Sequence, residues 1–519
     1  MLVFRFGTLT YGARGTLLTF SGQSHSSFLL PAGRRGRAVA VAASVSAVAL
    51  IAVFSSPADA TPSSGLGGQG QAATVPHSLS AVFPGCSWPV ETTPTTANIA
   101  APDPYATYWL TPFLAKAGYS ITIKGTFPTS RFMSFAVYND SFLYFTNTVH
   151  GKTVQSGLSD YQIKPDRGSR NPWRTSQAGK RRKFTIRLRP GATAAQQKSG
   201  NAIPMIDQDS PADPMGPPGI GYVILRTYIP SGGNSTVRLP TMTVTHNGHH
   251  TILPQCTTST SSAEKTVPAL ARVLTVLKKE TEAGSMPATC TSSCANPELQ
   301  YFGPSLDEKS GLFPNPVNGY VSMNFTPRKG YVVVTHGKAP SSPVDAGSGK
   351  PGDSIGAYPV PWVKPRFQVR YWSISNYIDA APDPVVEIGR GSKTIFGGTP
   401  DYLTALKNGY YTVVSSLPAD KPSASSLKAS TATWIPMSAS HPTTPEFQLL
   451  RNMLSQQSLY PEGFAFINPP ANPSAIIPPA TVRKQMGAYY PQTAECTVQT
   501  FETQGWTGCL AANTGSGLG

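Results

Sequence analysis

Two stretches of this sequence decide its fold because they repeat each other: residues 131–135 are RFMSF and residues 370–374 are RYWSI. In the first, Phe132 and Ser134 would share one face and Met133 would lie on the other, which is the two-residue period of a β-strand. A tyrosine follows each stretch at the same spacing. We therefore expect one strand of the same design in each half of the chain.

Three further blocks recur in the same order. They pair ITIKG (121–125) with VVTHG (333–337), KFTI (183–186) with YYTV (410–413), and YVILR (222–226) with FQLLR (447–451). The first pair places Lys124 and His336 at one position. Residues 447–454 alone also fit an amphipathic helix, but their match to a strand-like block favours a strand. Four blocks in one order indicate a tandem duplication.

Composition favours strands and loops over long helices. Only 13% of the 519 residues are charged, while 50 prolines and 47 glycines supply many chain reversals. We predict a mainly β protein with two tandem, diverged β-sandwich or jelly-roll-like domains joined by a linker helix. The predicted segments are a flexible leader (61–80), the first copy (81–257), a linker with a helix (258–285), the second copy (286–512) and a flexible tail (513–519).

Residues 1–60 carry the features of a secretory signal with an extended N-terminal region. Three arginines precede a small-residue, apolar run (38–54), and Ala58-Asp59-Ala60 follows it. This pattern predicts cleavage after Ala60 and a protein that is secreted or lies on the extracellular side of the cell envelope. The alternative is an uncleaved membrane anchor, although the run barely reaches the roughly 17–25 apolar residues that a span needs.

All six cysteines lie beyond the predicted cleavage point, and an even number in an oxidising compartment indicates disulfides. Fifteen pairings are open. The one that brackets a domain or a short loop each time joins Cys86 to Cys256, Cys290 to Cys294 and Cys496 to Cys509. Zinc is the alternative, but no Cys-x-x-Cys spacing occurs. We therefore predict three disulfides, no metal and no other cofactor.

The chain is basic, with 42 Lys and Arg against 26 Asp and Glu. We predict as partner an anionic cell-envelope polymer or a small anionic ligand, and no specific nucleic acid. Membrane contact is expected only through an uncleaved signal. The densest basic cluster (180–183) runs into a strand pattern at 183–189, where a solvated strand face is favoured over a binding patch.

Polar residues recur at matching points inside otherwise apolar strands. They are Arg131 and Arg370, Ser134 and Ser373, and Arg226 and Arg451. Because an unpaired charge there would be costly, each arginine needs a partner. The favoured interpretation pairs the arginines with carbonyls or with a carboxylate such as Asp166 or Asp379. In the other interpretation, the arginines bind a ligand's carboxylate or phosphate in a cleft lined by aromatic residues. The aromatic candidates are Tyr105, Tyr108, Trp109, Trp173 and Trp372, for which a place in the apolar core is the favoured alternative.

No familiar catalytic motif assigns a reaction to the chain. Gly-x-Ser-x-Gly and His-Glu-x-x-His are absent, and residues 246–250 (HNGHH) fit a hairpin turn better than a metal site. We predict an envelope-associated or secreted ligand-binding protein; the alternative is a secreted hydrolase or lyase with a site near His336 and Arg370. The predicted ligand-binding residues are Arg131, Ser134, Arg226, His336, Arg370, Trp372, Ser373 and Arg451.

Residues 434–436 (WIP) followed by 447–451 (FQLLR) resemble the closing W-x-P … L-x-L-R pattern of an uncharacterised β-rich domain of bacterial exported proteins. The first copy keeps only Pro217–Gly219 and the Leu225-Arg226 end of that pattern. Over residues 81–510 the chain resembles uncharacterised secreted proteins of actinobacteria. The blocks that carry this likeness are 102–104, 108–109, 131–134, 370–373, 409–412 and 486–491. The resemblance implies a compartment and a β-rich architecture, but no chemistry.

Overall fold

In the computed structural model, the described residues are 85–139, 147–149, 152–175, 181–205, 220–256, 300–301, 313, 315, 317–346, 359–380, 383–389, 393–467, 477 and 479–514. The predicted signal, the flexible leader, the linker helix and the Cys290–Cys294 pair lie outside the described residues. Among the described residues, no helix is long and apolar enough to cross a membrane.

The first copy is a β-sandwich of two five-stranded sheets. Its inner sheet has the strand order β1 (Val90–Thr92), β2 (Ala106–Leu114), β10 (Ile220–Pro230), β4 (Ser130–Tyr138) and β7 (Gly157–Ser159). Its outer sheet has the order β12 (His249–Leu253), β11 (Thr241–His246), β3 (Tyr119–Thr126), β8 (Lys183–Arg189) and β9 (Ala202–Pro204). Alternate apolar residues of both sheets meet between them, as in other sandwiches.

The second copy repeats this plan. Its inner sheet has the order β13 (Gln300–Tyr301), β14 (Asn318–Phe325), β23 (Glu446–Met453), β16 (Tyr371–Ile378) and β19 (Gly398–Pro400). Its outer sheet has the order β20 (Leu406–Lys407), β21 (Tyr410–Ser416), β15 (Tyr331–Lys338) and β24 (Gln492–Thr497), with β22 (Thr433–Pro436) parallel to β21. The mainly β, two-sandwich fold predicted from the sequence is therefore confirmed.

Short elements connect these strands. Two hairpins are formed by β5 (Asn147–Val149) with β6 (Lys152–Val154) and by β17 (Glu387–Ile388) with β18 (Ile395–Phe396). Among the described residues, the α-helices are α2 (Ala194–Gly200), α5 (Ala424–Ala429), α6 (Pro479–Met486) and α7 (Val498–Thr514). The 3₁₀ turns are η1 (Asp160–Gln162), η2 (Asn234–Thr236), η3 (Pro343–Ala346), η6 (Pro418–Asp420), η7 (Phe464–Phe466) and η8 (Gly487–Tyr489).

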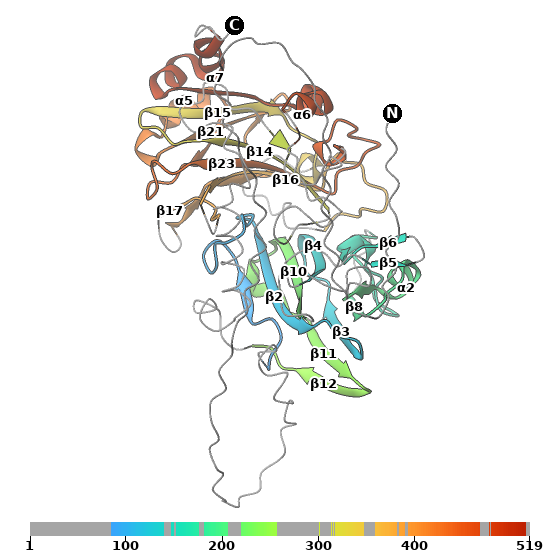
Figure 1. Ribbon diagram of the computed structural model, residues 1–519. Helices are drawn as coiled ribbons and strands as arrows, with labels where there is room; N and C mark the ends of the chain where they lie inside the picture. Colours follow the sequence, from blue (N-terminus) through green and yellow to red (C-terminus); the bar gives the residue numbers. More distant parts are fainter. Residues whose placement is uncertain are drawn as a thin grey trace, which may run out of the picture. The chain divides into compact units, whose positions relative to one another are not determined.

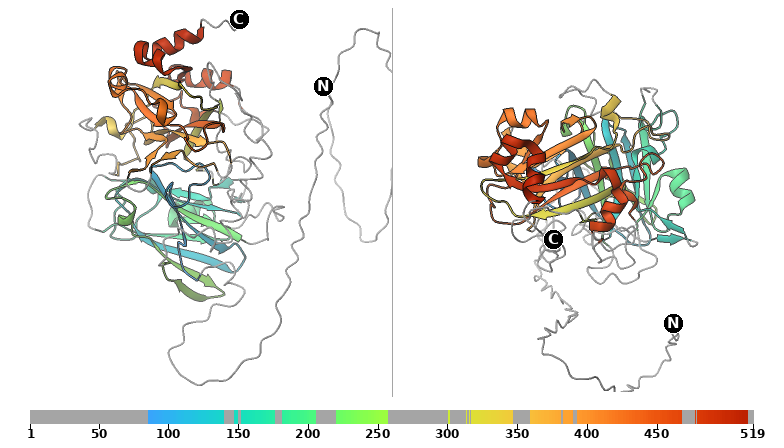
Figure 2. Two further views of the ribbon diagram at one scale, coloured as in Figure 1. Left: turned by 90° about the vertical axis from the view of Figure 1, so that its left-hand side faces the viewer. Right: turned by 90° about the horizontal axis from the view of Figure 1, so that it is seen from above.

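Figure 1 shows the four sheets as successive layers, with the inner sheet of each copy nearest the other copy. Figure 2 shows the same succession from the side, the second copy in yellow to red and the first in blue to green. An apolar cluster to which both copies contribute lies between the inner sheets and includes Phe132, Tyr228, Tyr371 and Met453.

Strand register confirms the duplication residue by residue. Arg226 lies opposite Ser134 in the first copy, and Arg451 lies opposite Ser373 in the second. Residues 447–453 are a strand, as their match to β10 predicts. A one-residue slip would turn every side chain to the other face, so the shared register is a strict test of equivalence.

The outer sheets agree in the same way. Lys124 pairs with Thr185 in the first copy, and His336 pairs with Thr412 in the second. The parallel edge strands β9 and β22 also correspond, because Leu188 pairs with Ile203 and Ser415 with Ile435.

One expectation from the resemblance is corrected by this register. The counterpart of Trp434–Pro436 in the first copy is Ala202–Pro204, and not Pro217–Gly219, which lies outside the described residues. Both strands run into the letters IPM, at residues 203–205 and 435–437. The match was hidden because an alanine stands where the motif has its tryptophan.

The described disulfides agree with the pairing predicted from the sequence. Cys86 is bonded to Cys256, and Cys496 is bonded to Cys509. The predicted hairpin turn is present as well, since Asn247 and Gly248 both adopt left-handed backbone angles (φ 49° and 81°) between β11 and β12. Such angles at both central residues are typical of a two-residue hairpin loop.

Candidate functional site

Two of the recurring arginines are buried where the two inner sheets meet. Arg131 donates from Nη1 to Asp401 Oδ2 at 2.9 Å, and Arg370 donates from Nη1 to Asp160 Oδ2 at 2.6 Å. Both guanidinium groups are fully buried. Burial raises the pKa of the Asp160 and Asp401 carboxyls, and the paired arginines oppose that rise. Each ion pair joins one copy to the other.

The other two arginines lie at the same interface. Arg451 donates to the carbonyl of Ala101, and its Nη1 lies 3.5 Å from Asp103 Oδ2. Arg226 donates to the carbonyl of Phe313 at 2.8 Å. Ser373 donates to Asp103 at 2.8 Å, and Ser134 is buried at the equivalent point of the first copy. These contacts favour the structural interpretation of the recurring polar residues over the ligand-binding one.

The arginines pair with other carboxylates than Asp166 and Asp379, which were expected from the sequence. Asp166 accepts a hydrogen bond from Thr185, and Asp379 accepts one from Asn324. The actual partners stand in a repeated motif that the sequence comparison missed, GLSDY at 157–161 and GTPDY at 398–402. The first three residues of the motif form the edge strand in each copy, and a strand of three residues is too short to give an apolar periodicity.

The aromatic candidates are mostly core residues. Trp109 and Trp173 belong to the apolar core of the first copy and Trp372 to that of the second. Tyr105 and Tyr108 lie beside Asp103 at the interface, where Tyr105 donates to the carbonyl of Gly398. These positions agree with the core alternative weighed for them.

A small cavity lies beside Trp372 in the second copy. Its walls include Lys338, Tyr411, Tyr460 and Tyr489, and its volume is about 20 Å³. That volume holds about one water molecule. Arg370 and His336 are not among its lining residues.

His336 lies on the outer sheet of the second copy, whereas the recurring arginines lie on the inner sheets. Its ring stacks on Trp506 of α7 with centroids 3.7 Å apart, and its Nδ1 lies 3.0 Å from Thr412 Oγ1. Burial lowers the pKa of His336. Arg370 instead faces Asp160, so the residues that the structure describes do not assemble the hydrolase or lyase site suggested by the sequence.

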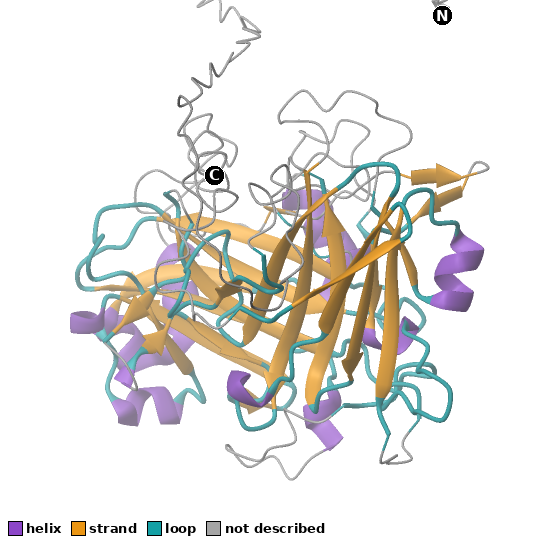
Figure 3. Ribbon diagram, turned by 90° about the horizontal axis from the view of Figure 1, so that it is seen from below, coloured by secondary structure: helices purple, strands orange, loops and turns teal. Residues whose placement is uncertain are grey.

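The outer sheet of the first copy presents a polar, basic face. In β8, Phe184, Ile186 and Leu188 are buried in the sandwich, so the alternate residues lie on the other side. Hydroxyl and cationic residues continue across three strands, in rows set by the register. We call this set the basic face: Lys124, Lys183, Arg187, Arg189, Thr122, Thr185, Thr241, Thr243 and Thr245. Lys124, Lys183, Arg189 and Thr241 are exposed, Thr185 is buried and hydrogen-bonded to Asp166, and the others are half-buried. The view in Figure 3 looks onto the outer sheet of the first copy.

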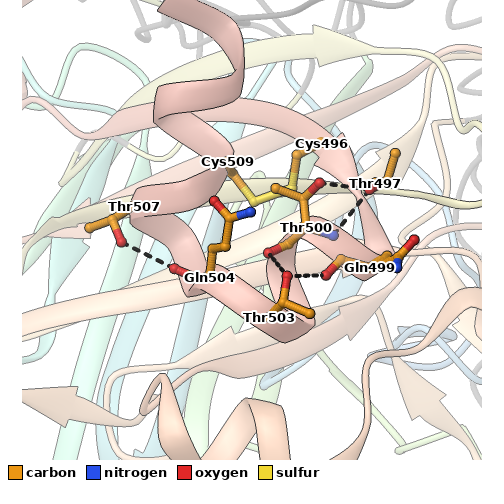
Figure 4. The surroundings of a disulfide bond; sticks show 8 residues. All are labelled: Cys496, Thr497, Gln499, Thr500, Thr503, Gln504, Thr507 and Cys509. Carbon is orange, nitrogen blue, oxygen red and sulfur yellow. Dashed lines mark hydrogen bonds between the residues drawn. A yellow bond between two sulfur atoms is a disulfide. The ribbon is translucent and has the colours of Figure 1, made fainter.

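The same face of the second copy is apolar and covered. Thr122 is replaced by Val334, Arg187 by Val414 and Thr243 by Ala494. These residues pack under α7 in a buried cluster that includes Phe501. The Cys496–Cys509 disulfide ties α7 to β24, and Thr497 caps the start of the helix by accepting from the Thr500 backbone N–H at 3.1 Å (Figure 4).

Charge follows the same division. Residues 81–257 carry 17 Lys and Arg against 8 Asp and Glu, and residues 286–512 carry 16 against 14. The first copy therefore holds +9 and the second +2. Of the four described carboxylates in the first copy, Asp103 and Asp160 are buried, which leaves Glu91 and Asp166 to offset the cations at its surface.

The cores differ too. Ile123, Val137, Leu188 and Val223 meet in the first copy. Their counterparts form a buried hydrogen-bonded network in which Gln448 donates to Asn376 at 3.0 Å and Thr335 donates to Gln448 at 2.7 Å. The counterparts, in the same order, are Thr335, Asn376, Ser415 and Gln448.

On the same strand as Gln448, Glu446 stands where the first copy has Gly221. Its Oε1 accepts from the Ser438 backbone N–H, and Oε2 has no hydrogen-bond partner among the described residues. Burial raises the pKa of Glu446 to about 8.

Among the described residues, no group of three or more His, Cys, Asp or Glu side chains is arranged to hold a metal ion. No protein-family model matches the chain, and no curated protein matches it. A putative uncharacterised protein from Burkholderia cenocepacia is similar in structure, with a TM-score of 0.43 and 12% identity over 80% of this chain and 82% of that one. The VPA0106 protein from Vibrio parahaemolyticus gives 0.35 and 10% over 78% and 92%.

Proposed function

We propose that this chain is an exported, envelope-associated binding protein that holds an anionic cell-envelope polymer on the basic face of its first copy. The observation that carries the proposal is the contrast between the two outer sheets. One duplicated surface is apolar and sealed by a disulfide-tied helix, while the other is cationic, with Lys124, Lys183 and Arg189 exposed.

The geometry of the basic face suits an extended, repeating anion. Adjacent strands lie about 4.8 Å apart and residues on one face about 6.7 Å apart along a strand, so cations and hydroxyls form a flat array. Lys124 has Thr185 beside it on β8 and Thr241 beside it on β11. A polymer can place successive charges over such rows, whereas a single small anion would use one or two of them.

Export is supported by the signal pattern and by the two described disulfides, which are typical of oxidising compartments. The arginines of the interface play no part in the proposed site because they are held in ion pairs inside the molecule. The proposed polymer contact therefore uses the cations of the basic face and not the recurring arginines predicted from the sequence.

Binding to long-chain polyphosphate, used as a model polyanion, tests the proposal. The mature protein should bind it, and more weakly as salt rises. Lys124→Glu with Arg189→Glu should weaken binding at least about tenfold, since two attractive contacts become repulsive. The control, Lys407→Glu with Lys428→Glu, makes the same change in net charge at exposed sites of the second copy and should change binding less than about twofold.

Equal losses in the two variants would show that net charge alone drives binding, and the assignment to the basic face would be wrong. Failure of the unaltered protein to bind polyphosphate at low salt would reject the polyanion itself.

A further inference from the structure

The interface between the two copies is reciprocal. Arg131 of the first copy pairs with Asp401 of the second, and the equivalent Arg370 of the second pairs with Asp160 of the first. Asp160 and Asp401 are themselves equivalent, each following the short edge strand of its inner sheet. A contact from residue i to j is thus matched by one from j to i, which defines an isologous, two-fold interface.

A second set of contacts obeys the same rule. Arg451 of the second copy donates to the carbonyl of Ala101 in the first, and Arg226 of the first donates to the carbonyl of Phe313 in the second. Ala101 and Phe313 both have left-handed backbone angles, with φ of 46° and 50°. Left-handed φ is uncommon outside glycine, so its occurrence at both equivalent positions indicates one shared loop geometry.

The apolar part of the interface is shared equally. Phe132 and Tyr228 of the first copy meet Tyr371 and Met453 of the second in one buried cluster. Register makes Phe132 equivalent to Tyr371, and Tyr228 equivalent to Met453. Each copy therefore offers the same patch to the other, as the subunits of a two-fold dimer do.

One point of the interface departs from the symmetry. Asp103 accepts hydrogen bonds from the Tyr371 hydroxyl and from Ser373, with Arg451 close by. At the equivalent point, Asn315 replaces Asp103 and Phe132 replaces Tyr371. The local turn is alike at the two points, since the backbone N–H of Tyr105 donates to Asp103 Oδ1 and the backbone N–H of Val317 donates to Asn315 Oδ1. Asp103 and the Tyr371 hydroxyl thus occur together at one of the two equivalent points, and neither an acid nor a hydroxyl stands in their places at the other.

We propose that the two copies bind each other as the subunits of a two-fold dimer would, so that the partner fitted by each inner-sheet surface is the other copy, and that Asp103 with Tyr371 restricts each copy to that partner. A pair of first copies would place Asp103 against Phe132, which offers the carboxylate no hydroxyl. A pair of second copies would have no Asp103 at all. The mixed pair is the one in which the buried acid and its donor meet, and such polar matching confers specificity.

Cutting the linker of the full chain tests the recognition. Neither described disulfide joins the copies, and Cys290 and Cys294 both lie on the second-copy side of a protease site inserted after Ser259. After cutting, the two halves should co-elute from a sizing column as a 1:1 complex. Arg131→Ala and Arg370→Ala should each weaken that complex about 100-fold or more, and by similar factors, because each leaves one buried carboxylate unpaired. Separation of the unaltered halves under native conditions, or a loss in one variant and not in the other, would overturn the two-fold interface.

Asp103→Asn with Tyr371→Phe tests the specificity. Both changes are close to isosteric, and they give each side of the interface the Asn and Phe pair already present at Asn315 and Phe132. In native mass spectrometry, the cut variant should form pairs of first copies and pairs of second copies together with mixed pairs, whereas the cut parent should form mixed pairs. Like pairs from the parent at the statistical ratio would reject a role for Asp103 in partner choice.

Discussion

The outer sheets of the two copies share strand order and register yet meet different surroundings. Val334 of the second copy is buried beneath α7, while Thr122 at the same position of the first copy lies on the basic face. The difference shows how a duplicated sandwich can vary the one face that its partner sheet does not cover. The inner faces could not vary so freely, because each is bound by the other copy.

The two copies also differ in their sandwich cores, but they differ less at the interface between their inner sheets. The sandwich core of the second copy has accepted a polar network where the first has apolar side chains. Between the inner sheets, the same arginine–aspartate pairs recur on both sides. Divergence is therefore greatest on the outer face, intermediate in the cores and least at the interface.

Matched lysine substitutions give the largest expected effect and would break the comparison most directly. Val334→Lys should lower the free energy of unfolding by about 3–5 kcal/mol, because it buries an unpaired charge under α7. Thr122→Lys, at the equivalent position, should stay within about 0.5 kcal/mol because its site is partly open. Denaturant unfolding measures both. Equal effects would mean that the two faces are covered alike.

Removal of the second-copy disulfide tests what holds α7 on its sheet. Cys496→Ser with Cys509→Ser should cost about 3 kcal/mol, the amount expected for a closed loop of this length, and should loosen α7 first. Hydrogen exchange would show the loss of protection in α7 and β24. Unchanged exchange in the first copy serves as the internal control, and an unchanged α7 would show that packing alone holds the helix.

The pH dependence of stability sharpens the comparison of the cores. The pKa of Glu446 is about 8 in the folded state and about 4.5 in the unfolded chain, so its carboxyl stays protonated to a higher pH in the native protein. Stability should therefore fall by up to about 1.4 kcal/mol per pH unit between these values and level off above pH 8. Glu446→Gln should flatten this slope, while Glu502→Gln, at an exposed site, should leave it in place. A slope retained in Glu446→Gln would place its origin elsewhere.

The repeated strand blocks were sufficient to predict the class of fold, the equivalence of Arg131 with Arg370 and the strand character of residues 447–453, because register ties each side chain to a face. The pairing of the described disulfides was predicted from the even number of cysteines and from the domain or short loop that each pair brackets. The helix α7 was not predicted, since Gly505 and Gly508 interrupt its pattern and its apolar residues are few.

The sequence by itself determined that two like sandwiches exist and that buried arginines recur in their strands, since both follow from local periodicity. Only the tertiary structure decided which carboxylates those arginines meet and which outer face is covered. Asp160 and Asp401 lie 210 and 270 residues from their arginine partners along the chain, and α7, which directly follows β24, also covers β15 and β21 from much earlier in the chain. Contacts across such separations depend on how whole sheets pack, and no local pattern of residues encodes them.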